Sequence, residues 1–141
     1  MFKPTKKVRV IDCLTLAGVN VDCWNGKANN IAYSCDWSFH DEARNISVFN
    51  IWAHEMGAHS TQLNLRKVQE SLPASSRRHN RARDMDQRLC KANQSGGIVR
   101  VIVIDGTWDN GNQKVKLREL HPQTFRVTSY NEVTGQATIE A

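Results

Sequence analysis

Residues 98–106 read Ile98-Val99-Arg100-Val101-Ile102-Val103-Ile104-Asp105-Gly106, and this run predicts a β-strand. Apart from Arg100, residues 98–104 are all apolar and β-branched, a composition that strands favour. Asp105-Gly106 favours a turn and therefore predicts the end of the strand.

A long helix is predicted immediately before this strand. Either Ser75 or Ser76 can cap its start, and the helix is expected to run to about Asn93, where Gly96 and Gly97 end it. Apolar residues recur at intervals of three and four along it and form one stripe. The stripe consists of Ala82, Met85, Leu89 and Ala92.

Apolar and polar residues alternate over residues 31–39, whereas residues 45–52 carry apolar residues on both alternating faces, so that both faces of this run look covered. Such alternation is typical of strands, and the polar residues 40–44 between the two runs suit a hairpin loop. The two paired strands are the expected centre of the sheet.

The remaining pattern completes the prediction of the fold. It indicates a short helix within residues 8–17, strands over 115–120, 125–130 and 136–140, a hairpin connection at 131–135, and an ambiguous stretch at 60–72. The order of elements predicts one α+β domain over residues 1–141, with a mostly antiparallel sheet, one long helix and one short N-terminal helix.

The composition is typical of a globular domain, and no membrane partner is expected. The chain has 141 residues, of which 40% are hydrophobic and 23% are charged. Its longest near-apolar stretch, residues 13–21, is far shorter than the roughly 20 residues of a membrane-spanning helix. The basic start is not followed by an apolar stretch with a cleavage site, so a cytoplasmic location is expected. The four cysteines form no CxxC pair, which argues against a zinc ribbon, and reduced thiols are favoured over two disulfides.

The positive charge is concentrated in the second half of the chain. Residues 1–70 hold 8 Lys and Arg against 7 Asp and Glu, whereas residues 71–141 hold 11 against 7. Basic residues cluster from the start of the predicted helix, where backbone amides also favour an anion, so phosphate contact is predicted. These residues are Arg77, Arg78, Arg81, Arg83, Arg88 and Lys91. The alternative is a solvated helix face on which Asp84 and Asp86 pair with neighbouring arginines.

Aromatic residues are concentrated in the first half, between Trp24 and Trp52. Most such rings are core residues in a small domain. Trp24 lies in a turn-rich stretch, where an exposed ring could stack on a base.

No complete catalytic or metal-binding motif is visible, so no catalytic residue, metal or cofactor is predicted. His54 and His59 are five residues apart and would point away from each other on a helix, which argues against a zinc protease motif. A metal-dependent nuclease site near Asp105, Asp109 and Lys114 or Lys116 lacks the acidic residue expected two positions before a lysine.

Short motifs over nearly the whole chain follow an order that resembles one family. They are residues 8–14, 18–21 with Trp24, 33–39, 48–52, 81–83 leading into 97–103, and 125–130 with Thr134-Gly135. The order resembles the N-terminal domain of the modified-cytosine-dependent HNH restriction endonucleases of the McrA type. In that family this domain binds DNA, often with preference for a modified base, and a C-terminal HNH module cuts.

The resemblance implies a non-catalytic domain that binds double-stranded DNA and reads a base of the methylated-cytosine class, in restriction or defence. The chain lacks the CxxC pairs and the His-His of an HNH unit, so a separate nuclease is a further implied partner. By position, the base pocket would comprise Trp24, Tyr33, Trp37 and Trp52, and Arg77, Arg78, Arg81 and Arg83 would contact the backbone. The alternatives are the small metal-dependent nuclease and a protein-interaction module of a phage or defence system.

Overall fold

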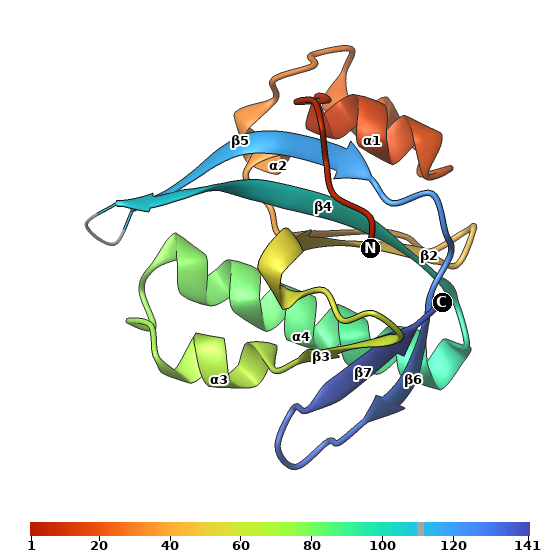
Figure 1. The fold of residues 1–141 in the computed structure, drawn as a ribbon, viewed down its shortest axis with the longest axis vertical. Helices are drawn as coiled ribbons and strands as arrows, with labels where there is room; N and C mark the ends of the chain where they lie inside the picture. The colour runs from red at the N-terminus through yellow and green to blue at the C-terminus, as the bar shows by residue number, and fades with distance from the viewer. Residues whose placement is uncertain (110–111) are drawn as a thin grey trace.

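A four-stranded sheet forms the middle layer of the protein (Figure 1). The computed structural model describes residues 1–109 and 112–141. The sheet has the order β1-β2-β4-β5, and its strands are β1 (Ser38–Asp41), β2 (Ile46–Trp52), β4 (Ile98–Asp109) and β5 (Asn112–Leu120). β2 and β4 run parallel, whereas β1 with β2 and β4 with β5 are antiparallel.

A second sheet of three antiparallel strands has the order β3-β7-β6. Its strands are β3 (Ser60–Leu63), β6 (Arg126–Tyr130) and β7 (Ala137–Glu140). A bridge between Val99 and Phe125 joins it to β4. The strands together form the predicted α+β architecture, with a curled and mostly antiparallel sheet.

Two helices cover opposite faces of the four-stranded sheet. α1 (Val10–Leu16) lies on one face and α4 (Arg77–Ser95) on the other (Figure 1). The connections include two short α-helices, α2 (Ile31–Ser34) and α3 (Leu65–Glu70), and two 3-10 turns, η1 (Asp22–Trp24) and η2 (Ala53–Glu55). No helix in the described ranges is long and apolar enough to cross a membrane.

The alternation of residues along β2 and β4 explains why two helices are needed. In β4, Val101 and Val103 pack in the cluster under α4, and Ile102 packs in the cluster under α1. In β2, Phe49 belongs to the α4 cluster and Val48 to the α1 cluster. All five side chains are fully buried, because both faces of this parallel pair are covered.

The long helix forms as predicted, with Ser76 as its cap. The Ser76 hydroxyl accepts a hydrogen bond from the backbone N–H of His79 at 3.1 Å. The helix ends at Gly96, whose φ of +64° is left-handed and favours glycine. The whole predicted apolar stripe is buried against the sheet: Ala82, Met85, Leu89 and Ala92.

The predicted strand over residues 31–39 is wrong in its first part. Residues 31–34 form α2, and β1 begins only at Ser38. The reason is local, because the Asn30 side chain accepts a hydrogen bond from the N–H of Ala32 at 3.1 Å and caps the helix. The predicted hairpin forms as β1 and β2, but the central pair of the sheet is β2 with β4. The ambiguous residues 60–72 hold both a strand, β3, and a helix, α3.

β4 does not end at Asp105-Gly106 as expected, because a β-bulge carries it on. Asp105 pairs with Leu117 and Gly106 with Val115, so Lys116 is an extra residue in β5. A Cβ atom on Gly106 would lie 1.8 Å from the backbone oxygen of Lys114, so glycine is required here. Beyond the bulge, residues 106–109 and 112–116 form an arm that extends past the end of β2 (Figure 1).

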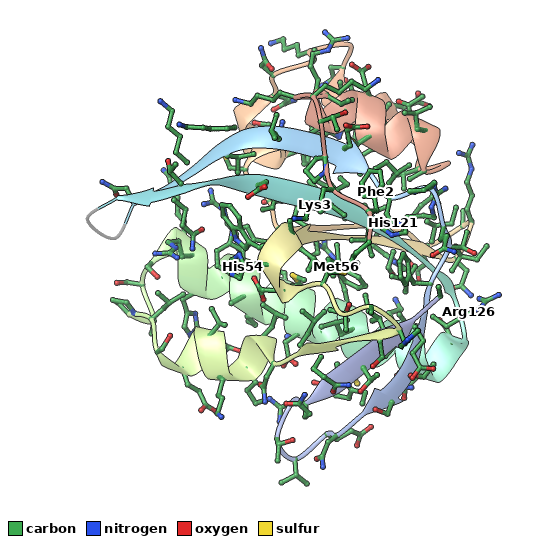
Figure 2. All side chains as sticks on the ribbon, viewed as in Figure 1. Phe2, Lys3, His54, Met56, His121 and Arg126 are labelled. Atoms are coloured by element: carbon green, nitrogen blue, oxygen red, sulfur yellow. The ribbon has the colours of Figure 1, made fainter. Side chains whose placement is uncertain are left out.

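The N-terminal segment lies against the connection between β5 and β6 (Figure 2). The rings of Phe2 and His121 are 5.0 Å apart, and the backbone N–H of Thr5 donates to Glu119 Oε1 at 2.6 Å. These contacts fix the outer edge of β5 near its carboxyl end.

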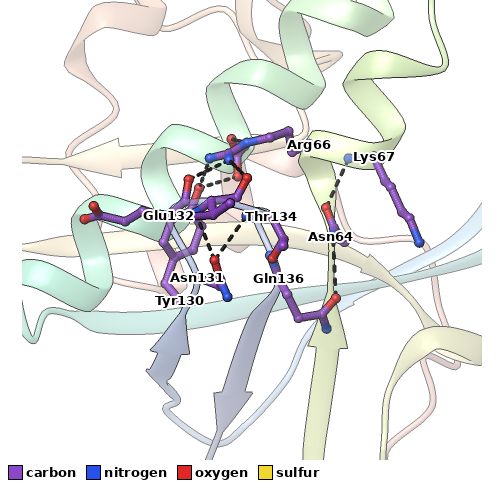
Figure 3. A network of polar contacts seen from close by, with 10 residues as sticks. Asn64, Arg66, Lys67, Tyr130, Asn131, Glu132, Thr134 and Gln136 are labelled. Atoms are coloured by element: carbon purple, nitrogen blue, oxygen red, sulfur yellow. Dashed lines mark hydrogen bonds and ion pairs between the residues drawn. The ribbon is translucent and has the colours of Figure 1, made fainter.

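A partly buried polar network ties the second sheet to the helices (Figure 3). Arg66 in α3 donates to the backbone oxygens of Glu132 and Val133 at 2.6 and 2.9 Å, and to the Tyr130 hydroxyl at 2.9 Å. The Tyr130 hydroxyl in turn donates to Asp86 of α4 at 2.6 Å. Arg66 also forms an ion pair with Asp86 at 3.4 Å.

Replacing Tyr130 by phenylalanine tests this network. Burial, together with the hydrogen bond to Asp86, raises the pKa of Tyr130 from 10.0 to about 12. The folded state therefore keeps this proton to a higher pH than the unfolded state, and stability falls as the pH rises from 10 towards 12. Tyr130→Phe should lower the free energy of unfolding at pH 7 by about 1–3 kcal/mol, because the buried Asp86 loses a donor. The variant should also lose less of its free energy of unfolding as the pH rises above about 10, which urea unfolding at several pH values measures. Equal slopes in both proteins would contradict the assignment.

Candidate functional site

A cavity of about 600 Å³ opens at the end of β2, where its parallel pairing with β4 stops. Trp52, the last residue of β2, and its register partner Ile104 both line it. The other walls come from residues 34–37, from the first turns of α4 and from the arm. The carboxyl ends of parallel strands are a common place for ligand sites, because the chain leaves the sheet there.

The cavity brings together four of the residues predicted from the sequence. Trp37, just before β1, packs against the α4 cluster, and Trp52, at the end of β2, packs against the α1 cluster, whereas Arg78 and Arg81 line the cavity from α4. The Arg78 guanidinium carbon lies 5.9 Å from the centre of the Trp37 ring, close enough for a cation–π contact. Two tryptophans and two arginines therefore line one cavity.

The polar lining was not predicted from the sequence. It includes the carboxyl groups of Asp36 and Glu55 and the amide of Asn50. Burial raises the pKa of Asp36, although Arg88 and Arg81 oppose this. Partial desolvation also raises the pKa of Glu55, although this residue is exposed. Both carboxyl groups thus keep a proton to higher pH than they would in water.

Asn50 has a fixed orientation in this lining. Its Nδ2 donates to the backbone oxygen of Asp36 at 3.2 Å, so the amide oxygen must point the other way. That oxygen is buried and has no hydrogen-bond partner in the described part of the chain. The sequence signal was a polar residue between the apolar Phe49 and Ile51.

Trp24 and Tyr33 do not belong to this cavity. The expectation of an exposed Trp24 ring is wrong, because the side chain is 2% exposed. Its ring lies 5.5 Å from Tyr33 and 6.5 Å from Phe39, in the core cluster beneath α1. The turn-rich sequence forms η1, which directs the ring inward.

The six basic residues of α4 separate into two groups. Arg78 and Arg81 line the cavity, and Arg77 is exposed at the first position of the helix. The other three already have partners within the protein. Arg83 pairs with Asp84 at 3.2 Å, Lys91 pairs with Glu42 at 3.4 Å, and Arg88 donates to the backbone oxygen of Ser38 at 2.7 Å and to its hydroxyl at 2.8 Å.

The residues named for a nuclease or zinc site have other surroundings. His54 and His59 are both exposed, and His54 lies in η2 (Figure 2). Asp105 Oδ1 accepts the N–H of Gly106 at 2.9 Å, and the side chain of Asp109 lies outside the described residues. Within the described residues, no three His, Cys, Asp or Glu side chains gather as a metal site would require.

Alanine variants of two arginines in α4 test their different placement. Arg88→Ala removes two charge-assisted hydrogen bonds to β1 and should lower the free energy of unfolding by about 1.5–3 kcal/mol. Arg83→Ala removes the same charge from an exposed ion pair and should change it by less than about 0.5 kcal/mol. Urea unfolding of both variants and the wild type gives the comparison. Equal effects would contradict a structural role for Arg88.

Comparison with known proteins identifies no family for this chain. No family model matches the chain, and comparisons with curated proteins and with solved structures find no match either. The resemblance to the McrA-type domain therefore stays a prediction.

Proposed function

We propose that the protein is a non-catalytic domain that binds double-stranded DNA and takes one base into the cavity beside β2. The observation that supports this most directly is the meeting of Trp37 and Trp52 with Arg78 and Arg81 around one opening of about 600 Å³. The tryptophans and the arginines lie far apart in the sequence, so their convergence is a property of the fold and not of a local motif.

The cavity has the size and lining of a site for an aromatic ligand. Its volume falls within the roughly 300–1,000 Å³ of small-molecule sites, and its walls combine apolar surface with a few polar groups. Tryptophan rings offer faces on which a base can stack. The carboxyl groups of Asp36 and Glu55 are available for hydrogen bonds to the edge of that base.

The start of α4 supplies the contact to the backbone. The first N–H groups of a helix and its dipole favour a phosphate, and Arg77, Arg78 and Arg81 add charge at the same end. Among the described residues, none of these three arginines is in an ion pair within the protein. They can therefore neutralise phosphates without breaking an internal ion pair. The preference proposed for the pocket is a modified base of the methylated-cytosine class.

DNA binding over a range of salt concentrations tests the electrostatic part of the proposal. Fluorescence anisotropy with plain, methylated and hydroxymethylated duplexes should show binding that weakens steeply with salt. The slope of log K against log salt should become shallower by roughly 0.9 in Arg78→Ala and in Arg81→Ala, because each substitution removes one cation from a phosphate. Arg83→Ala and Lys91→Ala are the matched controls, because they remove the same charge from internal ion pairs. An absence of binding at low salt would overturn the proposal.

The base pocket is tested separately with Trp37. Base–aromatic stacking contributes about 1–3 kcal/mol, so Trp37→Ala should weaken binding of the preferred modified duplex by about 5- to 150-fold. Because the phosphate contacts remain, the salt slope should stay that of the wild type. Trp37→Phe keeps an aromatic face and should retain most of the preference, and thermal unfolding checks that both variants fold. If Trp37→Ala binds modified and plain duplexes with the same affinity ratio as the wild type, the cavity is not the site that reads the base.

A further inference from the structure

The arm formed by residues 106–109 and 112–116 carries basic residues that the proposed function has not used. Lys114 and Lys116 in β5 are both exposed, and neither is in an ion pair among the residues that the structure describes. On the arm's other strand, the nearby carboxyl group of Asp105 accepts the N–H of Gly106.

The strand register shows which face of the arm Lys114 occupies. Val99, Val101 and Val103 of β4 pack in the cluster under α4. Alternate residues of a strand share a face, so Thr107 continues this face into the arm. Lys114 is paired directly with Thr107, and residues opposite each other in a sheet lie on the same face. Lys114 therefore lies on the face of the sheet that α4 covers.

This face of the arm lies near the start of α4. Figure 1 shows the arm extending on the side of the protein where α4 begins. The cavity joins the two elements, because Asn112 and Gln113 of the arm line it together with Arg78 and Arg81 of the helix. Lys114 follows Gln113 directly in β5, so a cation of the arm lies next to a residue that lines the same opening as Arg78 and Arg81.

We propose that the arm is a second phosphate-binding wall, with Lys114 contacting the DNA backbone on the side of the cavity away from Arg78. This inference rests on the proposed function. A nucleotide whose base enters a pocket has one phosphate on its 5′ side and one on its 3′ side. Cations on both sides of the opening match these two phosphates, whereas a single basic helix matches only one. Lys116 lies at the bulge, next to this contact.

The test compares Lys114→Ala with Lys91→Ala in anisotropy titrations of a duplex carrying the preferred base. Both variants remove one lysine charge, but Lys91 lies 13 residues beyond Arg78, about 20 Å along α4, and pairs with Glu42. Lys114→Ala should reduce the slope of log K against log salt by about 0.9, and Lys91→Ala should leave it unchanged. Lys114→Arg keeps the charge and should restore the slope of the wild type. The ratio between modified and plain duplexes should be the same in all four proteins, because the pocket is intact.

The outcomes separate this inference from the proposed function. If the wild type binds with a steep salt slope and Lys114→Ala has the same slope, the arm is not a phosphate wall, and the proposed function stands. Equal reductions in Lys114→Ala and Lys91→Ala would indicate an effect of net charge alone and would also overturn the inference. If the wild type shows no salt-dependent binding, both proposals are wrong. Lys114 is exposed, so circular dichroism should show an unchanged fold in each variant.

Discussion

The parallel pairing of β2 with β4 is the constraint on which the rest of the structure depends. Parallel neighbours cannot be joined by a tight turn and need a long crossover, which residues 53–97 supply. The crossover places α4 on one face of the pair. The other face of such a pair must also be covered, and α1 covers it.

The same pairing explains why the cavity and the start of α4 coincide. The chain leaves β2 at Trp52 and must enter β4 at Ile98, which pairs with Ile46 at the opposite end of β2. The helix that leads into β4 must run back along the strands, and it therefore begins near the end of β2. This topology brings the arginines at the start of α4 to the cavity that Trp52 also lines, although the two are far apart in the chain. β4 continues beyond the end of β2, so the space next to Trp52 is not filled by another strand.

Much of the fold could be predicted from the sequence, because its strongest patterns are local. The cap at Ser76, the apolar stripe of α4 and the apolar run at residues 98–104 each identify their element directly. The direction of strand pairing is a different matter, because no local pattern distinguishes a parallel neighbour from an antiparallel one. Apolar residues on both faces of β2 were the available signal, since they indicate a strand that is covered on both sides.

The candidate site was only half predictable for a similar reason. The sequence grouped Arg88 with the other basic residues of the predicted helix, but Ser38, which accepts hydrogen bonds from Arg88, comes from a strand 50 residues away. Asn50 and Glu55 reach the cavity through the end of β2, which sequence spacing alone does not locate.

The bulge at Gly106 divides the arm into parts with different freedom to evolve. Its base is closed to variation, because any side chain at Gly106 would collide with the backbone of Lys114. Beyond that point, the exposed positions of β5 contribute little to the core, so their charge can drift without loss of the fold. Related proteins could therefore differ in the charge of the arm while they keep the same fold and the same cavity.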